Sequence, residues 1–346
     1  MVAVPLTRAQ TETGLRPFDP LRDLGPLADL LEAAFGDRLH AEGRSMIADL
    51  RMMRWMSPLV WALFHSSAVF RAGLEGYVWM EDGRLVGNVS LAAVGDRRWS
   101  IGNVAVHPDY RRRGIARQLM QAAIGYVRDA GGTTVLLEVH ADNAPALHLY
   151  ESLGFRRLDA VTDLRRPAGA GAGALADQRE ALIQEQIRPI PWHQWRKVYE
   201  LALAATPPGA WQARPLRESA FRRSPLSGLL ESLTGRRVMR WAVINEAGNF
   251  DAAGMLEISP WASRPHRLTL WVRPSRLAGL AEPLAAHATR QIASLPPAEV
   301  VARIRADPPH LVEALQHHGF VAGLTTVQMA LDLRQRVPIQ IEGRYT

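Results

Sequence analysis

The 346-residue sequence contains no cysteine. This absence excludes disulfides, zinc-thiolate sites, a thiol nucleophile and an acyl-cysteine intermediate. Lysine is nearly absent as well: Lys197 is the only one, and arginine supplies every other basic side chain. We interpret this skew, which accompanies a net charge of +7, as codon bias in a GC-rich genome. The arginines are scattered along both halves, so no nucleic-acid partner is expected.

Long apolar runs are also missing. Stretches such as Pro58 to Phe64 are far shorter than the roughly 18 to 20 residues that a membrane-spanning helix requires. The segment from Met1 to Arg16 lacks the apolar block of a signal peptide. We therefore expect a cytoplasmic protein without a membrane partner. With 47% apolar and 22% charged residues the chain can bury full cores, and its length favours two domains.

An Ala/Gly-rich run divides the chain. Residues 165–176 read RRPAGAGAGALA, which is typical of a linker. We predict an N-terminal domain at 1–166, a linker at 167–176 and a C-terminal domain at 177–335. The glycines of this run fit a loose dinucleotide-binding pattern, but no apolar strand leads directly into them, so we reject that interpretation.

Three landmarks recur in the same order in the two halves. Their nearly constant separation indicates two copies of one fold. The matching pairs are Leu15-Arg16-Pro17 with Ile187-Arg188-Pro189, Val106-His107-Pro108 with Val272-Arg273-Pro274, and Gly154-Phe155 with Gly319-Phe320.

The first copy contains two helical patterns followed by strands and a strand, turn, helix, strand unit. The turn Glu81-Asp82-Gly83 between two apolar strands predicts a hairpin. The predicted elements are helices at Leu21 to Phe35 and around Ile47 to Phe64, hairpin strands at Gly76 to Met80 and Leu85 to Ala93, a strand at Trp99 to Val106, a helix from Gly114 to Gly131-Gly132, and a strand at Thr133 to Val139.

The segment His107 to Ala116, HPDYRRRGIA, joins a predicted strand to a helix start. A helix N-terminus presents unpaired N–H groups and a partial positive charge, and a glycine there lets a phosphate approach closely. Arg111, Arg112 and Arg113 would oppose the helix dipole at this position. An anionic ligand therefore explains their placement better than a solvated charge cluster does.

Two ordered segments resemble a known family. Arg111-x-x-Gly114-x-Ala116, after Val104-Ala105-Val106-His107-Pro108, resembles the coenzyme A signature of the GNAT superfamily of acyl-CoA-dependent N-acetyltransferases. Leu136 to Phe155, LLEVHADNAPALHLYESLGF, is similar to that superfamily's second signature and especially resembles enzymes that acetylate the N-terminal amine of a ribosomal protein. The resemblance implies an α/β fold with a mixed sheet: two GNAT-like domains, each a mostly antiparallel twisted sheet with splayed central strands flanked by helices.

The same resemblance implies a site for acetyl-CoA. The strands Trp99 to Val106 and Thr133 to His140 would splay apart to admit it, and a backbone N–H of the first would hold the oxyanion. Arg111 and Arg112 are the expected side-chain contacts, and the N–H groups from Arg112 to Ala116 would hold the pyrophosphate. The implied cofactor-binding residues are Val104, Ala105, Val106, Arg111, Arg112, Arg113, Gly114, Ile115, Ala116 and Asn143.

Two residues are candidates for catalysis. Tyr150 carries a phenol of pKa about 10, suited to donate a proton to a departing thiolate, although it could instead be a core aromatic. Glu138 is a carboxylate in the middle of an apolar strand. It is the candidate general base for the amine proton, with an ion pair or a substrate-ammonium anchor as alternatives. His140 is a weaker candidate base.

The remaining candidates allow two interpretations each. Asn143 lies about two helical turns from Tyr150, so both can face one ligand, but Asn143 could also cap the helix that Pro145 helps to begin. The segment Met52 to Phe64 lines either an acceptor pocket or the core. No metal is expected, because the histidines occur singly apart from His317-His318, which lack further ligands at zinc spacing.

The second copy is predicted to be degenerate. Its counterpart of the phosphate loop, Ser275 to Glu282, has no arginine after Arg276, and Leu315 and Arg303 stand in the places of Tyr150 and Glu138. We predict an N-acetyltransferase that moves an acetyl group from acetyl-CoA to a primary amine of a small molecule or a protein N-terminus by direct attack. The alternative is a non-catalytic acyl-CoA sensor. A homodimer and a monomer both stay open.

Overall fold

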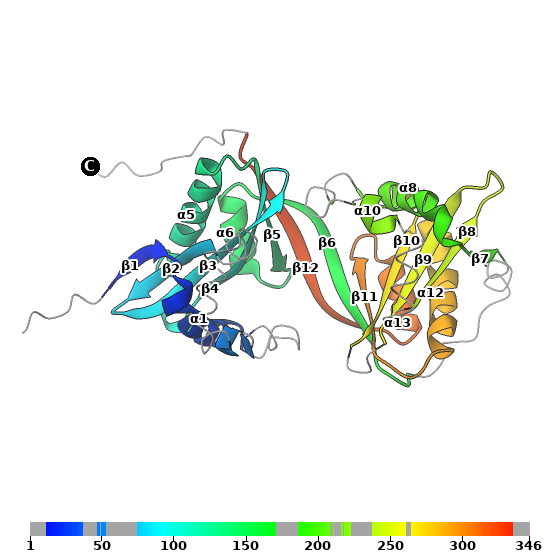
Figure 1. Cartoon of the computed structure of the whole chain (residues 1–346), viewed down its shortest axis with the longest axis horizontal. Helices are drawn as coiled ribbons and strands as arrows, with labels where there is room; N and C mark the ends of the chain where they lie inside the picture. The colour runs from blue at the N-terminus through cyan, green and yellow to red at the C-terminus, as the bar shows by residue number, and fades with distance from the viewer. Residues whose placement is uncertain are drawn as a thin grey trace, which may run out of the picture. The chain divides into compact units, whose positions relative to one another are not determined.

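The computed structural model describes residues 12–36, 47–48, 50–52, 75–170, 186–207, 210, 216, 218–222, 237–260 and 264–334. The chain forms two compact units, each a sheet flanked by helices (Figure 1). The first unit consists of Met1–Glu138, Leu149–Arg156 and Ala330–Thr346, and the second of Val139–His148 and Arg157–Met329.

Elements of the N-terminal half come first in the chain. They are β1 (Gly14–Pro17), α1 (Pro20–Phe35), β2 (Glu75–Glu81), β3 (Arg84–Gly95), β4 (Arg98–Val106), the 3-10 turn η2 (Pro108–Tyr110), α5 (Ile115–Asp129), β5 (Thr134–His140), α6 (Ala144–Ser152) and β6 (Arg156–Arg166).

Elements of the C-terminal half repeat this series. They are β7 (Ile187–Pro189), η3 (Trp192–Gln194), α8 (Trp195–Ala205), α10 (Glu218–Phe221), β8 (Arg237–Ile244), β9 (Phe250–Ile258), β10 (His266–Val272), η4 (Pro274–Arg276), α12 (Leu277–Ala293), β11 (Val300–Arg305), α13 (His310–His317) and β12 (Val321–Asp332).

The sheet topology is mixed, as predicted. Hydrogen-bonded neighbours follow the order β1-β2-β3-β4-β5-β12-β6-β11-β10-β9-β8-β7. The β4/β5 and β10/β11 pairs are parallel. The registers of β1 with β2, β2 with β3, β3 with β4, β7 with β8, β8 with β9, β9 with β10 and β6 with β11 are antiparallel. The predicted α/β class is therefore confirmed.

The predicted hairpin is confirmed as β2 and β3. Asp82 and Gly83 both have positive φ, 48° and 77°, which is the two-residue turn that matches strand twist. A second such turn joins β3 to β4, with Asp96 at 50° and Arg97 at 57°. It contains no glycine, so the sequence did not reveal it; tertiary bonds support it, since the Arg97 Nε donates to the Gly131 carbonyl at 2.7 Å.

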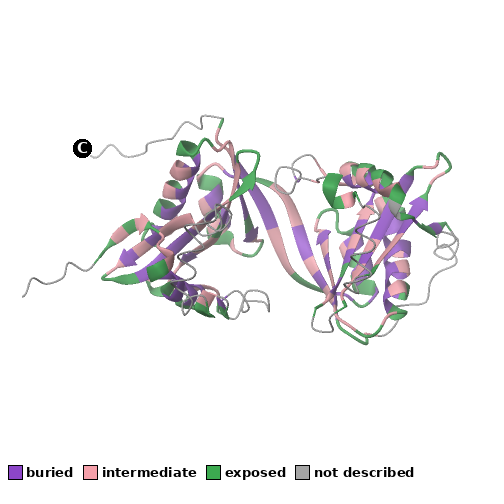
Figure 2. Cartoon of the chain, in the orientation of Figure 1, coloured by how far each residue is buried: buried purple, intermediate pink, exposed green. Residues whose placement is uncertain are grey.

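Helices cover both faces of the β2–β4 sheet in the first unit. Leu27 and Leu31 of α1 belong to one buried cluster with Val78 and Met80 of β2. On the opposite face, α5 lies so close to β3 that a Cβ on Gly87 would come within 3.0 Å of Ile115 and Leu119 side-chain atoms. Figure 2 shows buried segments on both the strands and the helices of this unit. Covering both faces explains why β3 is buried without alternation from Leu85 to Val89.

The second unit repeats this arrangement. Val198 and Leu201 of α8 form a buried cluster with Ala242 and Ala253, while α12 packs with Trp241 and Val243 in the main core. Gly154 and Gly319 follow α6 and α13 with φ of 91° and 82°. The next residue in each case bonds back identically, Phe155 N–H to the Tyr150 carbonyl and Phe320 N–H to the Leu315 carbonyl, both at 3.0 Å. The halves are thus two copies of one fold.

The two copies exchange their last strands. β6 precedes the Ala/Gly run, yet it pairs with β11 in the second unit, from Val161↔Arg305 to Arg166↔Val300. The end of β12 belongs to the first unit, where the Leu333 N–H donates to the Thr133 carbonyl at 2.9 Å. The compact units therefore do not follow a cut at residue 166. The domain limits 1–166 and 177–335 therefore remain a prediction of where each copy begins and ends in the sequence.

Some predicted regions lie outside the described residues. These are most of the Met52 to Phe64 segment and the part of the linker at 171–176. Residues 47–48 and 50–52 are helical, in agreement with the predicted second helix as far as it is described. In the portion of the chain that the structure describes, no helix is both long and apolar enough to cross a membrane.

Candidate active site

The central feature of the first unit is a fork between two parallel strands. β4 and β5 pair from Arg98↔Thr134 to Ile101↔Leu137, whereas the strands continue to Val106 and His140. Within the described residues, β4 beyond Ile101 has no strand partner on the side that faces the fork, so its backbone groups there could pair with a ligand. Val104, Ala105 and Val106, three of the predicted cofactor-binding residues, lie on this open arm of β4.

A bulge shapes the open arm. Asn103 has a φ of 50°, and the β3/β4 register shifts between Asn88 and Ser90. Asn88 is 1% exposed, and its Nδ2 donates to the Asn103 carbonyl at 2.9 Å and to the Ser90 Oγ at 3.2 Å. This buried network holds the strand in a conformation that L residues seldom adopt. Sequence patterns did not single out Asn88 and Asn103, although an Asn inside an otherwise apolar strand was the available signal.

The loop between η2 and α5 has the backbone geometry of an anion-binding cradle. Arg112 has a φ of 64° and Gly114 a φ of 77°, and α5 begins without a side-chain cap. Among the described residues, the backbone N–H groups of Arg112, Arg113 and Gly114 have no backbone acceptor. A Cβ built on Gly114 would meet nothing within 4 Å, so the approach is open. These donors at a helix N-terminus fit a pyrophosphate.

The three arginines of the loop have different surroundings. Arg111 donates from Nε to the Val106 carbonyl at 3.2 Å and from a terminal nitrogen to the Ala34 carbonyl at 3.1 Å, which ties the loop to β4 and α1. Arg113 lies over the Tyr110 ring at 4.9 Å. Within the described part of the chain, only Arg112 of the three makes no hydrogen bond, ion pair or ring contact. The exposed Arg112 guanidinium is therefore the one directly available to an anion.

Tyr150 lies on the buried face of α6. It is 6% exposed, and its ring centroid is 6.0 Å from that of Phe155. Burial raises the pKa of Tyr150 to about 12. Within the described residues its hydroxyl has no hydrogen-bond partner. The phenol therefore keeps its proton across the physiological pH range, and no described residue accepts that proton in a hydrogen bond.

Glu138 is the first residue of β5 beyond its pairing with β4. Leu137 pairs with Ile101, and Glu138 is exposed where the fork opens. The strand is buried on both faces from Val135 to Leu137, and Val139 is buried again, so the exposed carboxylate interrupts a buried run. His140, the weaker candidate base, belongs to the second unit, and its Nδ1 is buried without a hydrogen-bond partner in the described structure.

Asn143 has the capping role that the sequence left open. Its Oδ1 accepts the Ala146 N–H at 3.3 Å, and its carbonyl accepts the Leu147 N–H at 3.0 Å. Asn143 belongs to the second unit. Contact of its amide with the cofactor stays a prediction. Across the described residues no group of three or more His, Cys, Asp or Glu side chains could hold a metal ion.

Residues 41–155 match the Acetyltransferase (GNAT) family, a span that contains both the fork and the cradle. This third of the chain is similar to the GNAT acetyltransferase family. The resemblance inferred from the two signatures is thus confirmed.

Similar proteins agree with this family. The chain is 51% identical over 53 residues to the ribosomal protein bS18-alanine N-acetyltransferase of Salmonella typhimurium, which is 15% of this chain and 36% of that enzyme. It is 28% identical over 176 residues to the mycothiol acetyltransferase of Renibacterium salmoninarum, covering 49% and 48% of the two chains. The chain thus spans about a third to a half of the length of these curated relatives.

A solved structure shows the same fold along almost the entire chain. The GCN5-related N-acetyltransferase from Sphaerobacter thermophilus superposes with a TM-score of 0.53 at 16% identity, covering 92% of this chain and 95% of that one.

The second GNAT-like copy lacks the groups of the first. Leu315, fully buried in α13, occupies the position of Tyr150. Arg303 occupies that of Glu138, and its side chain donates to the Thr326 hydroxyl at 3.1 Å. The start of its helix carries Arg276 and Leu277 in right-handed helical conformation, without the left-handed glycine of the cradle.

Proposed function

We propose that this protein is an N-acetyltransferase that uses acetyl-CoA as donor and a primary amine as acceptor. The observation that carries the proposal is the fork between β4 and β5, which opens beside the uncapped start of α5. A cofactor with a pyrophosphate and an amide-bearing arm needs anion donors and an unpaired strand edge together. The first unit supplies both.

We assign the binding of acetyl-CoA to backbone groups and to the guanidinium of Arg112. The N–H groups of Arg112, Arg113 and Gly114 and the first turn of α5 would hold the pyrophosphate, with Arg112 adding charge. Residues Val104 to Val106 would pair with the pantetheine arm along the open edge of β4. Arg111 contributes indirectly, because its bonds to the Val106 and Ala34 carbonyls hold the loop in place.

Proton handling is assigned to Glu138 and Tyr150. An amine is mostly protonated near neutral pH, so a base must remove its proton before the nitrogen attacks the thioester carbon. The exposed Glu138 carboxylate at the mouth of the fork can do this directly or through water. As the carbon–sulfur bond breaks, Tyr150 gives its proton to the sulfur, and its high pKa ensures that it is protonated when needed.

The acceptor class is a primary amine of a small molecule or of a protein N-terminus. One relative bears the name of an enzyme acting on the alanine of ribosomal protein bS18, and another that of a mycothiol acetyltransferase. The first name supports an amine acceptor, and the second leaves the acceptor group open.

A thiol-release assay tests this function directly. The chain has no cysteine, so a thiol reagent reports only the coenzyme A released from acetyl-CoA. Peptides with free N-termini and small primary amines form the panel, and the matched peptides with blocked N-termini are controls. We expect release with at least one free amine and none with its blocked form. Coenzyme A binding without any amine-dependent release would contradict the enzyme and favour the acyl-CoA sensor.

A further inference from the structure

The second unit has a fork of its own. β10 and β11 pair from His266↔Val300 to Leu268↔Ala302, but the strands continue to Val272 and Arg305. In open α/β sheets, ligands bind beyond the carboxyl ends of parallel strands. The open end of β10 and β11 is therefore the place in the second unit where a ligand would be expected.

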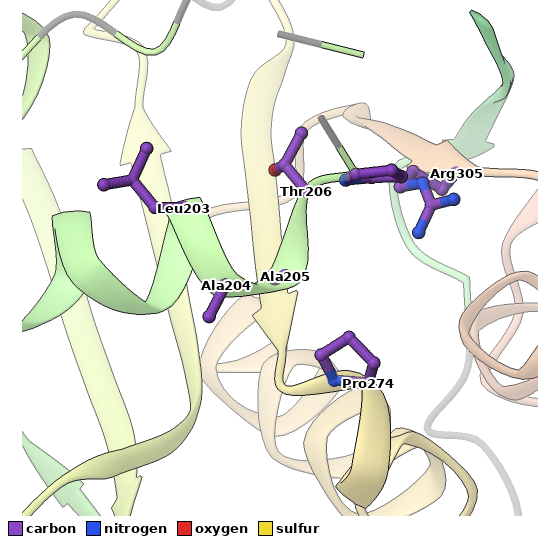
Figure 3. A pocket seen from close by; sticks show the side chains of 7 residues that line it. Leu203, Ala204, Ala205, Thr206, Pro274 and Arg305 are labelled. Carbon is purple, nitrogen blue, oxygen red and sulfur yellow. The ribbon is translucent and has the colours of Figure 1, made fainter. Parts of the chain in front are cut away.

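A pocket of about 410 Å³ lies at this open end (Figure 3). Its volume falls within the range of small-molecule sites. Pro274, just beyond β10, lines one side, and Arg305 at the end of β11 lies across the pocket from Leu203. The end of α8 provides the rest of the lining: Leu203, Ala204, Ala205, Thr206 and Pro207.

Coenzyme A phosphates do not match this pocket. The helical segment after β10 begins without glycine, and its two arginines both turn toward one buried carboxylate. The Nε atoms of Arg273 and Arg276 lie 3.6 Å and 3.3 Å from oxygens of Asp251, which is 6% exposed. Among the described residues that line the pocket, Arg305 is the one cationic side chain, and the segment offers no glycine at its helix start where a pyrophosphate could approach the backbone N–H groups.

Arg305 is prepared to bind one anionic group. Its Nε donates to the two oxygens of Asp159 at 3.2 Å and 3.1 Å, and the Asp159 side chain is 7% exposed. The buried carboxylate thus orients the guanidinium. Within the described residues the two terminal amino groups of Arg305 make no hydrogen bond. A pair of parallel N–H donors is the geometry that a carboxylate accepts.

We propose that this pocket binds a small molecule with a single carboxylate and a short apolar body. Arg305 takes the carboxylate, and the apolar side chains at the end of α8, with Pro274, contact the carbon chain. Thr206 is the only hydroxyl among the lining residues that the structure describes, which suits a hydrocarbon better than a sugar. The site is independent of acetyl transfer in the first unit.

Straight-chain carboxylates from acetate to octanoate, titrated against the full chain by saturation-transfer NMR, test the proposal. Hexanoate should bind saturably with a Kd on the order of 0.1 to 1 mM, and neutral hexanamide at least about tenfold more weakly. Arg305→Gln should weaken hexanoate binding by at least about tenfold. Arg112→Gln, in the first unit, should leave hexanoate binding unchanged.

Arg305→Gln leaves the buried Asp159 carboxylate without its ion-pair partner, so this variant could fail to fold. A second variant tests the proposal in that case. Ala204 is an exposed helix residue that lines the pocket, so Ala204→Trp fills the space without removing an internal contact. It should abolish hexanoate binding while coenzyme A binding persists. Equal binding of hexanoate and hexanamide, binding unchanged in both variants, or no saturation up to about 10 mM would overturn the proposal.

Discussion

At the scale of single residues, burial gives Tyr150 its chemical character. An exposed phenol would titrate near pH 10, whereas the pKa of Tyr150 is raised to about 12 because its surroundings disfavour the charged form. The proton is therefore present across the physiological range, and loss of the acid should not limit activity at any pH below about 11. A fall in the rate of acetyl transfer at low pH would then be caused by protonation of the general base or of the amine acceptor.

Tyr150→Phe removes the hydroxyl and keeps the ring that packs near Phe155. We expect turnover to fall on the order of 100- to 10,000-fold while the Kd for acetyl-CoA changes little, because the lost interaction belongs to the transition state. Pre-steady-state acetyl transfer and calorimetric binding measure the two quantities. Normal turnover with chemistry rate-limiting would refute the acid assignment.

Asn88 is the second residue whose role depends on burial. Asn88→Ala should destabilise the fold by about 1 to 3 kcal/mol, because it leaves the Asn103 carbonyl without its buried donor. It should also raise the KM for acetyl-CoA, since the bulge shapes the open arm of β4. Urea unfolding and steady-state kinetics give the two values. Ser100→Ala, on the paired part of β4, is the control, and an equal effect there would contradict a special role for the bulge.

At the scale of elements, the start of α5 is the most informative feature. Arg112→Gln should weaken coenzyme A binding on the order of 10- to 100-fold, because one charge-assisted bond contributes about 1.5 to 3 kcal/mol. Arg128→Gln removes the same charge from the last turn of the same helix and should have little effect. Titration calorimetry measures the affinity of both variants for coenzyme A. Equal losses of affinity would mean that only the overall charge of the protein matters.

Sequence patterns predicted individual helices and strands better than any other level of the structure. Alternation and glycine placement predicted the β2/β3 hairpin and α5, and the wider pattern predicted the two-copy organisation, because these depend on local backbone preferences. The turn at Asp96 and Arg97 was missed, because contacts with the distant segment 131–133 stabilise its left-handed residues. The capping of α6 by Asn143 was one of two alternatives until the hydrogen bonds were seen.

At the scale of the whole molecule, the two copies are tied together by exchanged strands. β6 completes the second unit and the end of β12 belongs to the first, so each unit contains residues from both halves. We expect a single cooperative unfolding transition, because neither unit is complete without the other half of the chain. Calorimetry checks this. Two separate transitions, or residues 1–166 alone as stable as the full chain, would contradict the expectation.

The two copies should differ in cofactor binding. Only the first has a left-handed glycine at its helix start, so coenzyme A should bind once per chain and raise the unfolding temperature accordingly. Titration calorimetry gives the stoichiometry. Two equivalent sites would show that the second fork accepts phosphates despite the pairing of its arginines with Asp251.

The sequence by itself indicated the family resemblance and the two copies, and it predicted where a phosphate-binding loop would lie, because these follow from short segments whose residue types act through the nearby backbone. Tertiary structure decided the rest. The roles of Arg111 and Arg112 diverge because one guanidinium reaches the carbonyl of Ala34, 77 residues away, and the other does not. The strand exchange likewise depends on pairing partners far apart in the chain, and alternation within a strand carries no information about its partner.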